Sequence, residues 1–236
     1  MQAVILAGGF GSRLRPLTDN LPKPMMPIIN KPILEYIIAH LRRNGIVEIA
    51  MTLGYKAEII ENYFGDGEKF GVNLTYFKED TPLGTAGCVK NAQSFLTEDF
   101  LVISGDAFTN IDIKALTDFH YSRNSTLTLA TKSLSDARGF GLVQCDESGK
   151  ITSFREKPAE KISGLVNMGI YVVSLAVLQD IPLAKFDFAK DLFPLLLGKL
   201  YSFQTSCFWS DIGTLSSYYS TNGYVARFPQ RFGLVF

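Results

Sequence analysis

Short apolar runs alternate with stretches of helical spacing through the first half of the chain. The runs predict strands at residues 2–6, 48–53, 73–76 and 100–104, and the stretches between them predict helices at 32–44, 56–64 and 85–95. This alternation predicts an α/β fold: a Rossmann-like, mostly parallel central sheet with helices on both faces. In such sheets ligands bind beyond the carboxyl ends of the strands, where the strand order reverses.

The pattern changes after about Ser125, where shorter strands are predicted at 126–132, 141–145, 150–155 and 169–173. Residues 147–149 are typical of a hairpin turn. An amphipathic helix is predicted at 187–200 and a further strand at 201–209. Because no linker separates the halves, we expect one domain over 1–236, with portions at 1–124 and 125–220 and a tail at 221–236 that is given no role. The second, smaller and β-rich portion is expected to close a cleft from the other side.

Composition narrows the class of protein. Hydrophobic residues make up 47% of the chain and charged residues 19%, which favours a globular core over disorder. Lys and Arg number 23 and so do Asp and Glu, so a nucleic acid or a membrane surface is not the expected partner. No apolar run reaches the roughly 18 residues of a membrane span, the first residues do not resemble a secretion signal, and three scattered cysteines suggest reduced thiols. We therefore expect a cytoplasmic protein.

A glycine-rich loop directly follows the first strand. It reads Gly8-Gly9-Phe10-Gly11-Ser12-Arg13, and Lys23 follows between two prolines. A glycine turn after a strand exposes backbone N–H groups that can face an anion. Two cations on such a loop suggest a polyphosphate, although the spacing matches neither the Walker pattern nor the dinucleotide-binding fingerprint.

Two carboxylates follow apolar segments. Asp106 comes directly after the fourth strand, and Asp211 lies two residues before Gly213. Either could simply cap a helix or a turn. If both converge on a polyphosphate, they offer the oxygen ligands that Mg²⁺ prefers.

Three further polar residues each allow two interpretations. Pro158 predicts an extended Lys157 that presents its side chain at a strand tip, where it binds an anion or is merely exposed. Asn167 at a strand entry binds a hydroxyl-rich ligand or holds a turn. Glu79 precedes a glycine-containing turn and is a ligand contact or a solvated loop acid.

The order of these motifs is more specific than any one of them. They are Leu6-Ala7-Gly8-Gly9-Phe10-Gly11-Ser12-Arg13-Leu14-Arg15-Pro16, Lys23-Pro24, Leu83-Gly84-Thr85-Ala86-Gly87, Gly105-Asp106, Glu156-Lys157-Pro158, Asn167-Met168-Gly169-Ile170-Tyr171 and Trp209-Ser210-Asp211-Ile212-Gly213. Over roughly residues 1–220 the chain resembles the sugar-1-phosphate nucleotidyltransferases, and within them it looks most like the mannose-1-phosphate guanylyltransferases.

The resemblance implies transfer of a nucleotidyl group to a sugar 1-phosphate with release of pyrophosphate. It implies catalytic roles for Arg13, Lys23 and Asp106, and a Mg²⁺ ion held by Asp106 and Asp211. The implied nucleotide contacts are Leu6, Ala7, Gly8, Gly9, Gly11, Ser12, Arg13, Lys23, Glu79, Pro82, Gly84, Thr85 and Asp106. The implied sugar-phosphate contacts are Gly141, Glu156, Lys157, Asn167 and Asp211.

Glu79 bears on the choice of base. The family position often holds Gln in thymidylyl- and uridylyltransferases, whereas a carboxylate accepts from both adjacent donors of guanine and repels adenine. GTP is therefore the favoured nucleotide, and the resemblance implies mannose 1-phosphate as the favoured sugar phosphate. The alternatives are uridylyl or other nucleotidyl transfer to a different sugar 1-phosphate, or a catalytically silent sensor of nucleotide sugars. A glycosyltransferase is disfavoured because the segment Gly105-Asp106-Ala107 lacks the second Asp of an Asp-x-Asp motif. A homo-oligomer is left open.

Overall fold

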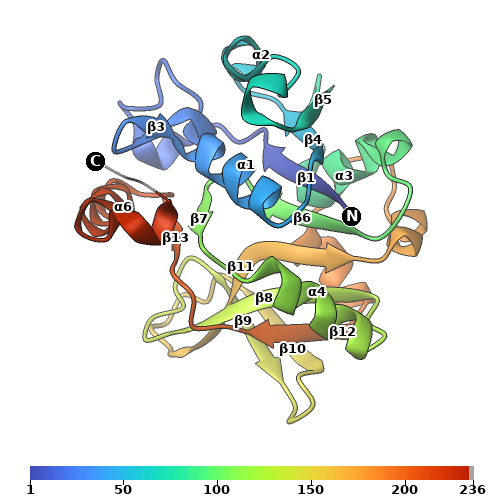
Figure 1. Cartoon of the computed structure of the whole chain (residues 1–236). Helices are drawn as coiled ribbons and strands as arrows, with labels where there is room; N and C mark the ends of the chain where they lie inside the picture. The colour runs from blue at the N-terminus through green and yellow to red at the C-terminus, as the bar shows by residue number, and fades with distance from the viewer. Residues whose placement is uncertain (234–236) are drawn as a thin grey trace.

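A nine-stranded mixed sheet forms the centre of the computed structural model, which describes residues 1–233 (Figure 1). The strands run in the order β10-β9-β11-β6-β1-β4-β5, with β8 paired to β11 and β12 paired to β8. The parallel part contains β1 (Gln2–Ala7), β4 (Glu48–Leu53), β5 (Asn73–Lys78) and β6 (Phe100–Ser104). The remaining strands are β8 (Leu127–Leu134), β9 (Gly141–Cys145), β10 (Ile151–Glu156), β11 (Gly164–Val173) and β12 (Leu200–Gln204).

Helices cover both faces of this sheet, and β1 is therefore buried on both sides. Ala3 and Ile5 of β1 share a core with α1, whereas Val4 packs into a second core with Val89 of α3. The helices are α1 (Ile33–Arg43), α2 (Ala57–Phe64), α3 (Gly84–Asn91), α4 (Ile113–Ser122), α5 (Phe193–Leu195) and α6 (Leu215–Arg227). Short 3-10 turns lie at Ser12–Leu14, Lys23–Met25, Glu68–Phe70, Gln93–Phe95, Leu175–Asp180 and Pro229–Phe232. The predicted α/β class, with helices on both faces, is confirmed.

The strand order reverses between β1 and β6. β1 pairs with β4 on one side and with β6 on the other, all in parallel, so the carboxyl ends of β1 and β6 are neighbours. The Gly105 amide donates to the Leu6 carbonyl over 2.8 Å, which joins the two chain segments just beyond the sheet. This is the switch point at which α/β sheets bind ligands.

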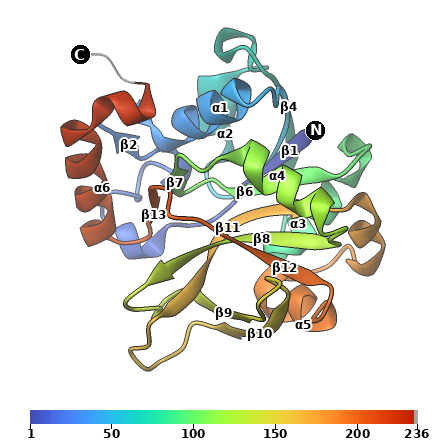
Figure 2. The ribbon, with the colours of Figure 1, turned by 60° about the horizontal axis from the view of Figure 1, so that its bottom comes forward.

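Strand β11 divides its partners along its length. Its residues 170–173 pair with β6, whereas its residues 165–166 pair with β9. Between them the register against β8 shifts, and Gly169 has a φ of +72°, a left-handed conformation that favours glycine. The irregularity leaves the segment from Asn167 to Gly169 facing the carboxyl end of β6 (Figure 2 shows β11 between β6 and β9).

A small sheet joins two distant parts of the chain. β7 (Ala107–Thr109) pairs antiparallel with β13 (Trp209–Asp211), so that Asp211 lies opposite Ala107. Ile212 donates its amide to the Asp106 carbonyl over 3.3 Å. This pairing brings the two acidic positions together. A second small sheet pairs β2 (Pro27–Ile28) with β3 (Lys31–Pro32).

The helix predicted at 187–200 is confirmed over residues 188–195 but ends earlier than predicted. The chain forms a π-helical stretch, Phe188–Leu192, followed only by α5, and Leu200 already belongs to β12. Gly198 turns the chain with a φ of +84°, so the helical segment ends before β12.

The single strand predicted at 201–209 is wrong, because the chain changes sheets within it. β12 pairs with β8, and β13 pairs with β7. Lys132 donates to the Cys207 carbonyl between them, where the chain turns away from the central sheet. Helix α6 was not predicted at all. It begins at a capping box in which Thr214 accepts from the Ser217 amide.

The division of the chain into a nucleotide-binding portion at 1–124, a sugar-phosphate-binding portion at 125–220 and a tail at 221–236 stays a prediction. No helix among residues 1–233 is long and apolar enough to cross a membrane.

Gly87 and Gly223 form a matched pair for testing the packing of α3. A Cβ on Gly87 would lie 2.2 Å from the Ala184 carbonyl oxygen, whereas a Cβ on Gly223 in α6 would meet nothing within 4 Å. We expect Gly87→Ala to lower the free energy of unfolding by about 1–3 kcal/mol through overpacking. Gly223→Ala should raise it by roughly 0.5–1 kcal/mol through helix propensity. Urea denaturation measures both, and a Gly87→Ala protein as stable as the wild type would contradict this packing.

Candidate active site

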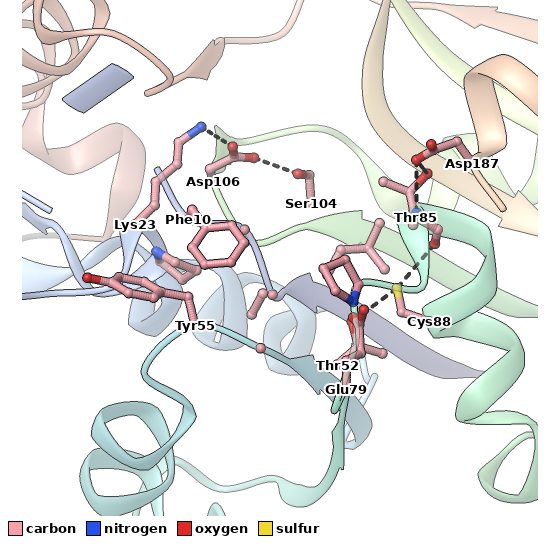
Figure 3. A pocket seen from close by; sticks show the side chains of 18 of the residues that line it. Phe10, Lys23, Thr52, Tyr55, Glu79, Thr85, Cys88, Ser104, Asp106 and Asp187 are labelled. Atoms are coloured by element: carbon pink, nitrogen blue, oxygen red, sulfur yellow. Dashed lines mark hydrogen bonds and ion pairs between the residues drawn. The ribbon is translucent and has the colours of Figure 1, made fainter. Parts of the chain in front are cut away.

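Two neighbouring cavities open at the carboxyl ends of β1 and β6. The larger has a volume of about 510 Å³ and the smaller about 290 Å³. Both linings share Thr85, Ser104, Asp106 and Asp187, which are labelled in the view of the larger cavity in Figure 3, so the cavities meet at these side chains. Volumes of this order suit small-molecule ligands.

The candidate residues distribute between the cavities in two groups. The larger cavity is lined by Leu6, Ala7, Gly8, Gly9, Lys23, Glu79, Pro82, Gly84, Thr85 and Asp106. The smaller cavity is lined by Asp106 again and by Gly141, Glu156, Lys157, Asn167 and Asp211. Their predicted roles stay predictions, but the two groups fall on opposite sides of one junction.

Three candidates of the glycine loop lie outside both linings as the described residues form them: Gly11, Ser12 and Arg13. Gly11 supports the site from behind. Its φ is +63°, and a Cβ there would lie 3.1 Å from the Cβ of Lys23. Arg13 lies beside Asp211, since a Cβ on Gly213 would be 2.8 Å from its Nη2 atom and 2.9 Å from the Asp211 Oδ1 atom.

An ammonium group bridges the two carboxylates at the junction. Lys23 Nζ donates to Asp106 Oδ2 and, over 3.1 Å, to Asp211 Oδ1. Ser104 Oγ donates to the other Asp106 oxygen over 2.5 Å. Neither carboxylate caps a helix, because Asp112 and Thr214 cap the helices that follow. The alternative reading of these aspartates as helix caps is therefore wrong.

The charges of this cluster shift one another's pKa values. Burial alone would lower the pKa of Lys23, but the adjacent carboxylates outweigh burial and raise it above its ordinary value. Burial opposes ionisation of Asp106, yet the Lys23 ammonium holds the pKa of Asp106 below its usual range. Burial and the Asp106 charge together raise the pKa of Asp211. Two carboxylates this close need a cation between them.

The cluster also fits a divalent cation. Among residues 1–233, no group of three or more His, Cys, Asp and Glu side chains converges as a metal site. Asp106 and Asp211 are two oxygen donors at the edge of a ligand cavity, and Mg²⁺ commonly binds through one or two carboxylates plus phosphate oxygens. The donor set therefore suits a cation that arrives with a phosphate ligand.

Glu79 is held in place at the far end of the larger cavity. Its Oε2 atom accepts from the Leu83 amide over 2.7 Å. A Cβ on Gly8 would lie 3.1 Å from its Oε1 atom, so a side chain at this position would press on the carboxylate. Burial raises the pKa of Glu79. The reading of Glu79 as a freely solvated loop acid is wrong.

The smaller cavity is lined by both acidic and basic side chains. The Lys157 ammonium lies 3.1 Å from the Glu156 carboxylate and is largely exposed. The predicted extended conformation of Lys157 is wrong, since its φ is +47°. The Lys157 amide donates to the Phe140 carbonyl over 3.0 Å, and this contact holds the turn. Asn167 lines the cavity and also holds a turn, because its Oδ1 atom accepts from the Gly169 amide over 2.9 Å.

Asp187 connects the two cavities and carried no signal in the sequence. Its Oδ1 atom accepts from the amide and hydroxyl of Thr85 over 3.1 and 3.2 Å. The Phe188 amide donates back to the Thr85 hydroxyl over 3.0 Å. The Phe186 carbonyl accepts from the Ala86 amide over 2.9 Å. The segment before the π-helical stretch thus caps α3 from across the site.

Two aromatic side chains flank the glycine loop and were not predicted as site residues. Phe10 is 59% exposed and lies 5.4 Å from Tyr55 between ring centroids, and both line the larger cavity (Figure 3). The Tyr55 hydroxyl donates to the Asp19 carbonyl over 3.1 Å and so ties the loop to the segment after β4.

A glycine-lined cavity at the switch point of a parallel sheet, with clustered cations and carboxylates, is the architecture of a nucleotide-binding α/β enzyme. The family model described as nucleotidyl transferase matches residues 2–227, and the chain belongs to this family. The predicted family resemblance is confirmed.

Curated relatives span more than one nucleotide. The UTP–glucose-1-phosphate uridylyltransferase of Synechocystis sp. is 36% identical over 93% of this chain and 62% of its own length. The mannose-1-phosphate guanylyltransferase of Mycobacterium tuberculosis is 35% identical over 91% of this chain and 61% of its own length. The chain thus spans less than two thirds of these relatives.

Other relatives match over nearly their whole length. The D-glycero-alpha-D-manno-heptose 1-phosphate guanylyltransferase of Aneurinibacillus thermoaerophilus is 37% identical over 92% of this chain and 95% of its own length. A crystal structure of HddC from Yersinia pseudotuberculosis complexed with GMP-PN has a TM-score of 0.83 and 31% identity, covering 94% of this chain and 98% of that one.

The Asp187–Thr85 contact predicts a stability effect across the site. We expect Asp187→Ala to lower the free energy of unfolding by about 1 kcal/mol, as for a lost helix cap, and to speed hydrogen exchange at the Thr85 amide. Asp187→Asn keeps an acceptor oxygen and should lose less. Asp118→Ala, on an exposed helix face, is the matched control and should leave stability nearly unchanged. Equal stabilities of the Asp187→Ala and Asp118→Ala proteins would contradict the cap.

Proposed function

We propose that this protein transfers a nucleotidyl group from a nucleoside triphosphate, favouring GTP, to a sugar 1-phosphate, favouring mannose 1-phosphate, and releases pyrophosphate. One observation carries the proposal: Lys23, Asp106 and Asp211 meet where the two cavities join. A triphosphate in the larger cavity and a sugar phosphate in the smaller one would bring their phosphates to this point.

The reaction needs alignment and charge cancellation more than proton transfer. An oxygen of the sugar phosphate attacks the α-phosphorus in line, a new P–O bond forms, and the bond from the α-phosphorus to the bridging oxygen breaks. A phosphate dianion is already a competent nucleophile, so no general base is required. Both histidines are buried away from the cavities, with His40 bonded to the Ile111 carbonyl and His120 to the Thr128 hydroxyl.

The cations have distinct proposed roles along the transferred phosphates. Lys23 contacts the phosphate under attack, and Arg13 holds the phosphates that leave as pyrophosphate. Lys157 at the rim of the smaller cavity binds the phosphate of the sugar phosphate, with Glu156 and Asn167 near the sugar hydroxyls. Such contacts work by positioning two anions that otherwise repel.

Asp106 and Asp211 would hold Mg²⁺. When bound, the ion offsets the negative charge that develops on the transferring oxygens. The residues themselves position the phosphates and keep the two anionic substrates in register.

The proposed base preference depends on Glu79. Its carboxylate is fixed by the Leu83 amide and faces Gly8 in the larger cavity, where it can accept from the N1–H and 2-amino groups of guanine. Relatives named guanylyltransferases support GTP.

One second candidate function has an observation in its favour. The Synechocystis relative named a uridylyltransferase supports UTP and glucose 1-phosphate as an alternative pair. A silent sensor is disfavoured because Arg13, Lys23, Asp106 and Asp211 are all present.

The direct test is pyrophosphate release across the four NTPs and dTTP, each paired with mannose, glucose, N-acetylglucosamine and heptose 1-phosphates. We expect the highest kcat/KM with GTP and mannose 1-phosphate, and a loss of about 100- to 1000-fold in kcat for Lys23→Met. A protein that binds nucleotide yet turns over no pair would contradict the proposed activity and favour a sensor.

The proposed role of Glu79 predicts a change in base preference. Hydrogen bonds to charged groups contribute about 1.5–3 kcal/mol, so Glu79→Gln should reduce the GTP-over-UTP ratio of kcat/KM by at least about tenfold. Burial raises the pKa of Glu79, and guanine needs the ionised form. The KM for GTP should therefore rise as the pH falls toward this raised pKa, and it should rise less in the Glu79→Gln protein.

Asp80→Asn is the matched control, because Asp80 lines the same cavity next to Glu79. It should keep both the preference and the pH profile of the wild type. A Glu79→Gln protein that keeps the full GTP preference would remove this account of base selection.

A further inference from the structure

The site between the Asp106 and Asp211 carboxylates is already occupied by a cation, the Lys23 ammonium group. The Lys23 side chain is 11% exposed, and the side chains of Asp106 and Asp211 are 23% and 26% exposed. The ammonium contacts both carboxylates at once. Within residues 1–233, no other lysine, arginine or histidine forms an ion pair with either aspartate. Lys23 is therefore the cation that forms an ion pair with both carboxylates, while Arg13 lies beside Asp211 without forming a direct ion pair with it.

The Lys23 backbone is held firmly, so any exchange of partners must come from its side chain. Lys23 lies between Pro22 and Pro24 and is the first residue of the 3-10 turn Lys23–Met25. The Met26 amide closes this turn by donating to the Lys23 carbonyl over 3.1 Å, and Gly11 packs against the Lys23 Cβ. Lys23 also lines the larger cavity, so its side chain can turn from the carboxylates toward an anion there.

A divalent cation and the Lys23 ammonium cannot occupy the site between the two carboxylates at the same time. Mg²⁺ sits about 2.0–2.1 Å from its carboxylate oxygens. Lys23 Nζ lies 3.1 Å from Asp211 Oδ1 and closer still to Asp106 Oδ2. A divalent ion bound to both of these carboxylate oxygens would be in contact with the Lys23 ammonium. Two cations in one half-buried site repel each other.

We infer that Lys23 is the resident counter-ion of the Asp106–Asp211 pair in the nucleotide-free protein, and that it must leave before a divalent cation binds there. The inference rests on the proposed function, which assigns these carboxylates to the metal. A triphosphate in the larger cavity gives Lys23 a new anionic partner. Nucleotide binding therefore vacates the site between Asp106 and Asp211, and the metal can bind there. Metal and nucleotide therefore bind with positive coupling, and the coupling is reciprocal.

The test measures metal binding without nucleotide in the full chain. Mn²⁺ is titrated and the free ion is followed by electron paramagnetic resonance, for the wild type and for Lys23→Met. The Lys23→Met substitution removes the ammonium from the site between the two carboxylates. This variant should therefore bind Mn²⁺ about 10- to 100-fold more tightly than the wild type, the usual range for coupling between two ligands. A simple structural role for Lys23 would predict the opposite, since loss of the bridge would disorder the carboxylates.

Lys157→Met is the matched control. Lys157 lines the neighbouring cavity but pairs with Glu156 instead of the two aspartates. This variant should bind Mn²⁺ as weakly as the wild type. An equal gain in both variants would mean that general loss of positive charge explains the effect, and would overturn the inference.

Lys23→Gln keeps the proposal testable if Lys23→Met folds poorly. Its amide can still donate to one carboxylate while the positive charge is gone. Its melting temperature should rise with Mg²⁺ alone, whereas that of the wild type should not. If Mg²⁺ or Mn²⁺ alone has no greater effect on either Lys23 variant than on the wild type, the inference is wrong. Turnover of the wild type tests the proposed function separately, so the two can fail independently.

Discussion

One ammonium group between two carboxylates is the contact on which the site depends. Lys23 comes from the loop after β1, Asp106 from the end of β6, and Asp211 from β13. The pairing of β7 with β13 forces the two acids together, and their mutual repulsion is relieved only if a cation lies between them. Asp106, which accepts from Lys23, lines both cavities, so this contact lies where they meet.

The junction also explains why the two halves of the chain form one site. β11 pairs with β6 through its second half and with β9 through its first, so the smaller cavity opens beside the end of β6. On the opposite side Asp187 caps α3 and closes the wall that both cavities share. Phosphates held on either side would then be separated only by the charged cluster.

Buried strands and the residues at their ends could be predicted because their signals are local. β4, β6 and β9 begin and end where the apolar runs do. Asp106 was recognisable for the same reason. The place of Asp187 in the site was not, because it depends on contacts with Thr85, 102 residues away in the chain. The left-handed turn at Lys157 likewise depends on the distant Phe140 carbonyl. Phe10 and Tyr55 belong to the cavity through packing that no spacing indicates.

The most direct measurement is a crystal structure of the protein with Mn²⁺ and a non-hydrolysable GTP analogue, with the metal located by its anomalous signal. The account predicts Mn²⁺ between Asp106 and Asp211, with the Lys23 ammonium turned onto a phosphate of the analogue. Mn²⁺ bound away from these carboxylates, or a Lys23 ammonium that still bridges them beside a bound triphosphate, would contradict it.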